Sequence, residues 1–139
     1  MSLTETRFSQ VQTFNKDILG IVPRSVGVLP SNEFKLSHTQ LTEEANEFLQ
    51  AAENNDLIGC LDAIIDSLYF SYGILYKLGV DEDDLNKLFT IVHNANMGKK
   101  KGVKAGREGH GDAADATKPD DWKDPRKLME EYIDATYLP

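Results

Sequence analysis

Apolar residues recur at helical spacing along most of the chain, and residues that stop helices separate the runs. Residues 4–19 carry an apolar stripe and are followed by Gly20, which predicts a first amphipathic helix. Residues 21–36 contain two prolines, a glycine and an asparagine, which favours a loop. No stretch shows the strict alternation typical of a strand, so the pattern predicts an all-α chain.

Two further helices are predicted to follow one another closely. Ser37 and Gln40 have the spacing of a capping box, which opens a helix that runs to about Glu53. Asp56 caps the next helix, residues 57–77, which is apolar nearly all round and is therefore expected to be buried. Because the connection is very short, the two helices should lie antiparallel and side by side.

Two more helices are predicted in the second half of the chain. Asp81 begins an acidic first turn, and Asp124 followed by Pro125 opens a last helix that clasps the bundle or a neighbouring subunit. The expected fold is an antiparallel bundle of four to five helices in a single domain, residues 1–139. The core stripe of the fourth helix is Leu85, Leu88, Phe89 and Val92.

Acidic side chains share one face on each of the two neighbouring helices. Glu43 and Glu44 lie four and three residues before Glu47, and Asp62 lies four residues before Asp66. These spacings place side chains above one another on a helix, where like charges repel. Since Mg²⁺ prefers oxygen ligands and keeps several waters, a few carboxylates can hold it while phosphates complete its shell. The two acidic stripes are therefore predicted to meet at one ion.

Each acidic stripe also has a plainer interpretation. The three glutamates, residues 43–47, also fit a solvated acidic turn near the positive end of a helix. Asp66 is flanked by Tyr69 and Phe70, and the alternative is a buried acid bonded to a core lysine or tyrosine. An ionised carboxylate between aromatic rings is costly unless it is paired or coordinates a metal, so Asp66 requires a partner in either case.

Residues 98–118 differ from the rest of the chain, being glycine-rich and locally basic, and are expected to form a flexible loop. The cations of this loop suit an anionic ligand; the alternative is a solvated mobile loop without a ligand. Before the loop, Asn96 falls on an apolar stripe, where its amide bonds either to protein or to a nucleobase or sugar. His93 has no second His or Cys at zinc-ligand spacing. The basic residues of the loop are Lys100, Lys101, Lys104 and Arg107.

The amino-acid composition and net charge limit the kinds of molecule that the protein is expected to bind. The chain has 139 residues, 40% hydrophobic and 27% charged, which is a globular balance, and its net charge of −8 argues against nonspecific nucleic-acid binding by the whole surface. Cys60 is the single cysteine, so no intrachain disulfide is possible. The N-terminus has no signal-peptide pattern, and no apolar run approaches the length needed to span a bilayer. We therefore expect a cytoplasmic protein without membrane or nucleic-acid partners.

The motifs resemble those of the all-α nucleoside-triphosphate pyrophosphohydrolases, the superfamily of MazG, the dimeric dUTPases and phosphoribosyl-ATP pyrophosphohydrolase. The resemblance runs from about residue 41 to 124, and the phosphoribosyl-ATP pyrophosphohydrolase-like proteins are the nearest group. Much of the superfamily has a Glu where Ala63 stands, and the resemblance implies that Asp62, one place earlier, substitutes for it; whether Asp62 or Asp66 contacts the metal directly stays open. The matching motifs are Glu-Glu-x-x-Glu at Glu43, Glu44 and Glu47; Asp-x-x-x-Asp-x-x-Tyr at Asp62, Asp66 and Tyr69; Val-His-x-x-Asn-Met-x-Lys at residues 92–99; and Lys-Pro-x-x-Trp at residues 118–122.

The resemblance implies a reaction, (d)NTP + H₂O to (d)NMP + pyrophosphate, by attack of water at the α-phosphate. It implies Mg²⁺, with Mn²⁺ as an alternative, and assembly as a homodimer or homotetramer through the apolar helix. The same fold without catalysis would give a nucleotide- or metal-binding module, and a third possibility is a helical interaction module whose basic loop touches nucleic acid. The implied site residues are catalytic Glu43, Glu44 and Glu47; metal-binding Glu44, Glu47, Asp62 and Asp66; and substrate-binding Asn96, Lys99 and Lys118.

Overall fold

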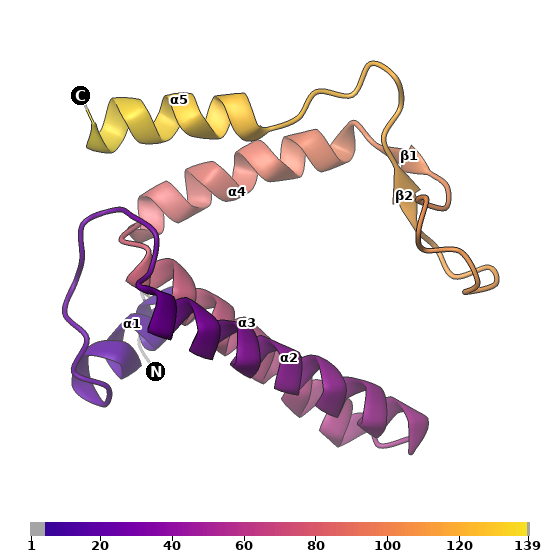
Figure 1. The fold of residues 1–139 in the computed structure, drawn as a ribbon, viewed down its shortest axis with the longest axis horizontal. Helices are drawn as coiled ribbons and strands as arrows, with labels where there is room; N and C mark the ends of the chain where they lie inside the picture. The colour runs from indigo at the N-terminus through magenta and orange to yellow at the C-terminus, as the bar shows by residue number, and fades with distance from the viewer. Residues whose placement is uncertain (1–4, 139) are drawn as a thin grey trace. The chain divides into compact units, whose positions relative to one another are not determined.

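A computed structural model describes residues 5–138 of the protein. Those residues form five helices and one short pair of strands (Figure 1), which confirms the all-α class. Thr4, where the first helix was expected to begin, and the N-terminus examined for a signal sequence lie outside the described residues. The elements are α1 Arg7–Asp17, α2 Ser31–Glu53, α3 Leu57–Lys77, α4 Glu82–Met97, β1 Lys100–Lys101, β2 Ala116–Thr117 and α5 Arg126–Tyr137.

The chain divides into two compact units, Met1–Glu82 and Asp83–Pro139, here called the first and second unit. The first unit holds α1, α2 and α3, and the second holds most of α4 together with the strand pair and α5. The single domain expected from chain length stays a prediction.

Helices α2 and α3 form the antiparallel hairpin that was predicted (Figure 1). Asn55 takes a left-handed conformation (φ 55°), and the carboxylate of Asp56 accepts a hydrogen bond from the Gly59 N–H at 3.0 Å. A Cβ on Gly59 would lie 2.9 Å from the Cβ of Ala51. Glycine at this position therefore lets the two helices approach closely just after the turn.

Helix α1 packs against the second half of α3. The ring of Phe8 lies 6.0 Å from that of Tyr72, and Phe14 meets Tyr69 edge-on at 5.4 Å between centroids. Gly73 is buried where α1 crosses, with Asn15 next to it. The core of the first unit therefore gathers at this end of the hairpin.

The start of α2 differs from the prediction. The helix begins at Ser31, so the capping box expected at Ser37 is wrong, and Ser37 is a buried residue in the middle of the helix. The carbonyl of Pro30 accepts the first N–H groups of the helix, and no helix breaker follows. Arg24 also forms two hydrogen bonds, 2.7 and 2.8 Å, with the carboxylate of Glu33 in the first turn. This ion pair ties the preceding loop to the helix start.

Helix α3 is far less buried than its composition predicted. One face packs on α1 and α2, but the opposite face is exposed, so the expectation of a wholly buried helix is wrong. By length and composition alone, α3 is also long and apolar enough to cross a membrane. The expectation that no apolar run approaches that length is therefore wrong. Its exposed large apolar residues are Leu57, Ile58, Leu61, Ile64, Ile65, Leu68 and Tyr69.

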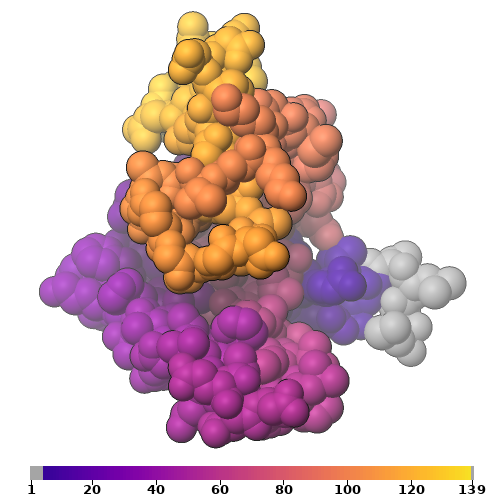
Figure 2. Space-filling view, turned by 90° about the vertical axis from the view of Figure 1, so that its right-hand side faces the viewer, coloured from indigo at the N-terminus to yellow at the C-terminus, as the bar shows by residue number. Residues whose placement is uncertain are grey.

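In the second unit, α5 is held to α4 by a hydrogen bond from the Tyr132 hydroxyl to the buried carboxylate of Asp84. Phe89, expected on the core stripe of α4, is 69% exposed. The strands β1 and β2 were not predicted, because two residues each are too few to show alternation. Residues 100–118, orange in Figure 2, lie on the surface facing the viewer.

Candidate active site

Four of the five predicted acidic residues gather where α2 packs on α3. Glu44 faces inward from α2 and is only 8% exposed, while Asp66 is half-buried on the inner face of α3. Glu47 and Asp62 are more exposed at the edge of the same interface. Small neighbours on the inner face of α3, such as Ala63, allow α2 close enough to bury a carboxylate.

Burial sets the electrostatics of Glu44. Loss of solvent raises the pKa of its carboxyl, the charge of Glu47 and a hydrogen bond with it raise the pKa further, and the charges of Asp66 and Asp62 add to this. The Oε2 atom of Glu44 is buried and has no hydrogen-bond partner. An ionised Glu44 is thus poorly satisfied by the described protein atoms.

Asp66 is perturbed in the same direction. Burial raises the pKa of its carboxyl, and the charges of Asp62 and Glu47 raise it further. The plainer interpretation required a lysine or tyrosine bonded to Asp66. In residues 5–138 the ion pairs are those of Arg24, Arg107 and Arg126, and none involves this carboxylate. The cluster therefore carries negative charge without a protein cation to offset it.

A divalent cation suits the chemistry of this donor set. The cluster offers only carboxylate oxygens, one of them buried and without a partner, and these are the ligands that Mg²⁺ takes. Within the described part of the chain, no three acidic, His or Cys side chains stand close enough to hold an ion as they are. Holding one would require the exposed side chains of Glu47 and Asp62 to turn inward.

Glu43 lies apart from the cluster. Its side chain is exposed, and its charge is not among those that raise the pKa of Glu44 or Asp66. The structure therefore does not bring together all three glutamates of the motif. Glu43 sits on the solvent side of α2, next to the buried acid.

The three predicted substrate-binding residues belong to the second unit. Asn96 is exposed near the end of α4, so the expectation that it lies on an inward stripe is wrong. Lys99 and Lys118 meet at Trp122, with their Nζ atoms 5.7 and 4.4 Å from the centroid of the indole ring. In the sequence, Trp122 is recognisable only as the last residue of the Lys-Pro-x-x-Trp motif, and its contact with both lysines cannot be inferred from spacing.

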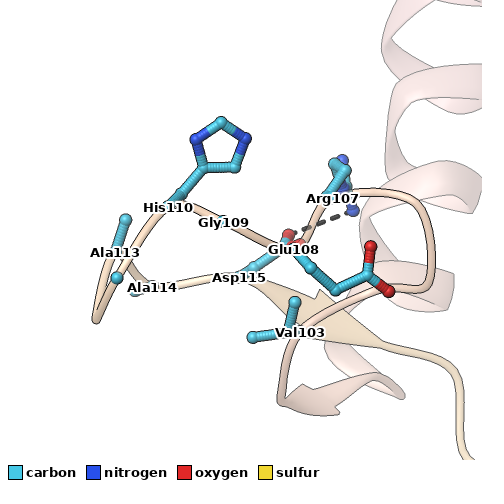
Figure 3. Close-up of a pocket in the computed structure, with 9 residues that line it drawn as sticks. Val103, Arg107, Glu108, Gly109, His110, Ala113, Ala114 and Asp115 are labelled. Atoms are coloured by element: carbon cyan, nitrogen blue, oxygen red, sulfur yellow. Dashed lines mark ion pairs between the residues drawn. The ribbon is translucent and has the colours of Figure 1, made fainter.

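A pocket of about 330 Å³ lies within the loop of the second unit (Figure 3). Arg107 reaches across it to Asp115, with 3.0 Å between Nη2 and Oδ1, and Glu108 accepts the N–H of Gly106. Hydrogen bonding from the backbone of Ala116 lowers the pKa of Asp115, and further bonds and charges act in the same direction. The arginine of this pocket is therefore already paired.

Sequence reasoning also missed two buried polar residues of the first unit. Ser37 lies two helical turns before Glu44 on the same face of α2, and its hydroxyl also has no hydrogen-bond partner. Asn15 is 3% exposed, donates to the carbonyl of Val11 at 2.9 Å and lies against Gly73. Each of the two lies at helical spacing from an inward residue: Asn15 is four residues after Val11, and Ser37 is seven before Glu44. This spacing was the sequence feature that could have predicted their burial.

A comparison with known protein families matches the part of the chain that contains α2, α3 and their acidic residues. The family model for phosphoribosyl-ATP pyrophosphohydrolase matches residues 12–96, more than half of the chain. The match contains the acidic residues of α2 and α3 and ends at Asn96, before Lys99 and Lys118. No curated protein matches the chain. The chain belongs to the phosphoribosyl-ATP pyrophosphohydrolase family and is a nucleotide pyrophosphohydrolase of the MazG-like all-α superfamily.

Proposed function

We propose that the protein is a Mg²⁺-dependent hydrolase that converts a nucleoside or deoxynucleoside triphosphate and water to the monophosphate and pyrophosphate. The observation that carries this proposal is the buried, unpartnered carboxylate oxygen of Glu44 among three other acids. Like charges gathered without a protein cation are unfavourable, and a shared divalent ion would remove that cost. The family match supports the reaction class.

Glu44, Glu47, Asp62 and Asp66 would hold the ion. When bound, Mg²⁺ neutralises phosphate charge and aligns the α-phosphate with a water molecule. The chain's own groups handle the proton. The exposed carboxylate of Glu43, or a carboxylate that also holds the ion, accepts it from the attacking water. The water oxygen bonds to the α-phosphorus, and the bond to the bridging oxygen breaks, so that pyrophosphate leaves.

The proposed substrate contacts are Asn96, Lys99 and Lys118. Asn96 is exposed at the end of α4, where its amide can hydrogen-bond to the nucleoside. Lys99 and Lys118 would bind the pyrophosphate that leaves, because an ammonium group offers three donors and a full positive charge.

The second candidate is a nucleotide- or metal-binding module without catalysis, and the spacing of the acids favours its nucleotide-binding form. The described acids do not stand at ion-holding distance from one another, as they would in a preformed metal centre. A pyrophosphate-release assay over a panel of triphosphates, with Mg²⁺ or Mn²⁺, separates the two candidates. Release from at least one triphosphate that stops on chelation supports the enzyme, and binding without release supports the module.

We also propose that the protein assembles as a homodimer or homotetramer through the exposed apolar face of α3. Ile58 is 72% exposed and Ile65, seven residues later on the same face, is 58% exposed. Such a stripe is costly in water and is typical of a covered interface. Asp62 and Asp66 lie in the same helix, and charged aspartates are costly inside a bilayer, which favours a protein partner over a membrane.

A further inference from the structure

A second cavity of the second unit is lined by four cationic side chains. Its volume is about 310 Å³, at the lower end of the range for small-ligand sites, and Ala105, Ala116 and Thr117 complete its wall. Among the ion pairs of residues 5–138, only Arg107 of the four takes part, with Asp115. Within the described residues Lys99 and Lys118 form no ion pair, in a protein of net charge −8, while the charge of Lys104 acts on the carboxylate of Asp115. The four cations are Lys99, Lys104, Arg107 and Lys118.

Trp122 organises two of these cations. Its indole N–H donates to the carbonyl of Ala95 at 2.7 Å, which fixes the ring against the last turn of α4. A Cβ on Gly98 would lie 3.6 Å from Cδ1 of the indole, so glycine leaves the ring room beside the helix end. The ammonium group of Lys118 is 4.4 Å from the ring centroid and that of Lys99 is 5.7 Å away. One ring therefore attracts two like charges that would otherwise repel each other.

We propose that this cavity binds a chain of two or three phosphates without a divalent metal, and that Trp122 is the positioning residue that holds Lys99 and Lys118 toward it. The ligand is a polyphosphate because several separate cations match several adjacent phosphate charges, and lysine binds phosphate as a point charge. The inference rests on the proposed function only in naming a nucleoside triphosphate as the natural source of that chain.

Trp122 is the single tryptophan, so its fluorescence reports on the surroundings of one ring, over which Lys99 and Lys118 of the cavity lie. Inorganic tripolyphosphate is titrated into the full chain in excess EDTA, and a saturable change that weakens with added salt is expected. Lys118→Gln should weaken binding by about tenfold or more, the effect of losing a charged hydrogen-bond donor. Lys127→Gln is the matched control, since it removes the same charge from an exposed position in α5 and should leave affinity unchanged. No saturable change, or equal losses in the two variants, overturns the proposal.

The positioning role is tested by calorimetry with two replacements of Trp122. Trp122→Phe keeps a ring face and should bind tripolyphosphate within a few-fold of the wild type, whereas Trp122→Leu should lose as much affinity as Lys118→Gln. Circular dichroism checks that both variants keep their helix content. Rescue by Phe is not expected if the residue acts only by donating its N–H. Equal affinities for Phe and Leu therefore refute the positioning role.

Three further ligands decide the source of the phosphates. A nucleoside triphosphate should bind at least as tightly as tripolyphosphate in EDTA, and a single-stranded oligothymidylate should bind more weakly than either. Tighter binding of the oligonucleotide would make the cavity a nucleic-acid site and overturn the proposal. Glu47→Gln separates this inference from the proposed function, because it should lose pyrophosphate release while keeping metal-free binding. Metal-free binding without any pyrophosphate release in the wild type refutes the proposed function alone.

Discussion

The carboxylates of Glu44 on α2 and Asp66 on α3 lie close enough across the helix interface for the charge of Asp66 to raise the pKa of Glu44. Both groups are perturbed first by burial. Two helices thus hold acids against each other in a place where neither ionises easily. This strain in the free protein underlies the first two predictions below.

The stability of the metal-free protein should fall as pH rises, and Glu44→Gln should reduce that fall. The folded-state pKa of Glu44 is raised above its ordinary value of 4.5, so the folded protein binds its proton more tightly than the unfolded chain. The stabilisation is complete below the ordinary pKa and is lost as pH rises through the folded value. At neutral pH, Glu44→Gln should raise the free energy of unfolding by about 1 kcal/mol. Melting temperatures from about pH 4 to pH 8 in EDTA test this, with exposed Glu43→Gln as the control. A variant that melts with the wild-type pH profile contradicts the assignment of this pH dependence to Glu44.

Pyrophosphate release should depend on the acids that cluster and on a divalent ion. Glu47→Gln and Asp66→Asn should each lower kcat/KM by at least about 100-fold, because each removes charge from the proposed ion site. Exposed Glu130→Gln in α5 is a control with the same charge change. Chelation should abolish release and added Mg²⁺ should restore it. Mg²⁺ should also raise the melting temperature of the wild type but not of Asp66→Asn. Full activity in either acidic variant, with unchanged circular dichroism, would refute the proposed site.

The sequence predicted a helix boundary correctly where a single capping residue determines it. Asp56 caps α3 through a local hydrogen bond, and that boundary is confirmed. The predicted start of α2 was wrong. Ser37 and Gln40 have the spacing of a capping box, but in the structure the helix begins after Pro30, and Glu33 in its first turn pairs with Arg24. That pair joins residues nine positions apart across a loop, which no local pattern reveals.

The candidate site was predictable only in part for a similar reason. Helical spacing indicated that Glu44 and Glu47 lie on one face of α2, and the charges of Asp62 and Asp66 on α3 do act on Glu44. Spacing does not say which of them is innermost, since that depends on the line along which α2 meets α3. Burial of Glu44 and exposure of Glu43 followed from that contact. Likewise, an all-round apolar helix such as α3 does not reveal whether its own chain or a second copy covers it.

Gly79 should be much less tolerant of substitution than Gly20. Both have positive φ, 93° and 70°, but a Cβ on Gly79 would lie 2.7 Å from backbone atoms of Ser25 and Val26, while Gly20 has open space around it. Gly20→Ala should cost about 1 kcal/mol of stability, the strain of the left-handed conformation alone. Gly79→Ala should cost about 3 kcal/mol or more, because the loop before α2 must also move. Urea unfolding of both variants measures the difference, and equal losses would show that the close approach at Gly79 is not maintained in solution.

The exposed face of α3 should determine the oligomeric state. Ile58→Glu combined with Ile65→Glu places two charges on one apolar stripe without touching the inner face that packs on α2. The wild type should elute as a dimer or tetramer by size exclusion with light scattering, and the double variant as a monomer, because desolvating two unpaired carboxylates would cost several kcal/mol. Val28→Glu is the control, since Val28 is 88% exposed in the loop before α2 and should leave the assembly intact. A monomeric wild type would contradict the proposed interface. Dissociation by Val28→Glu as well would show that assembly does not depend on α3 alone.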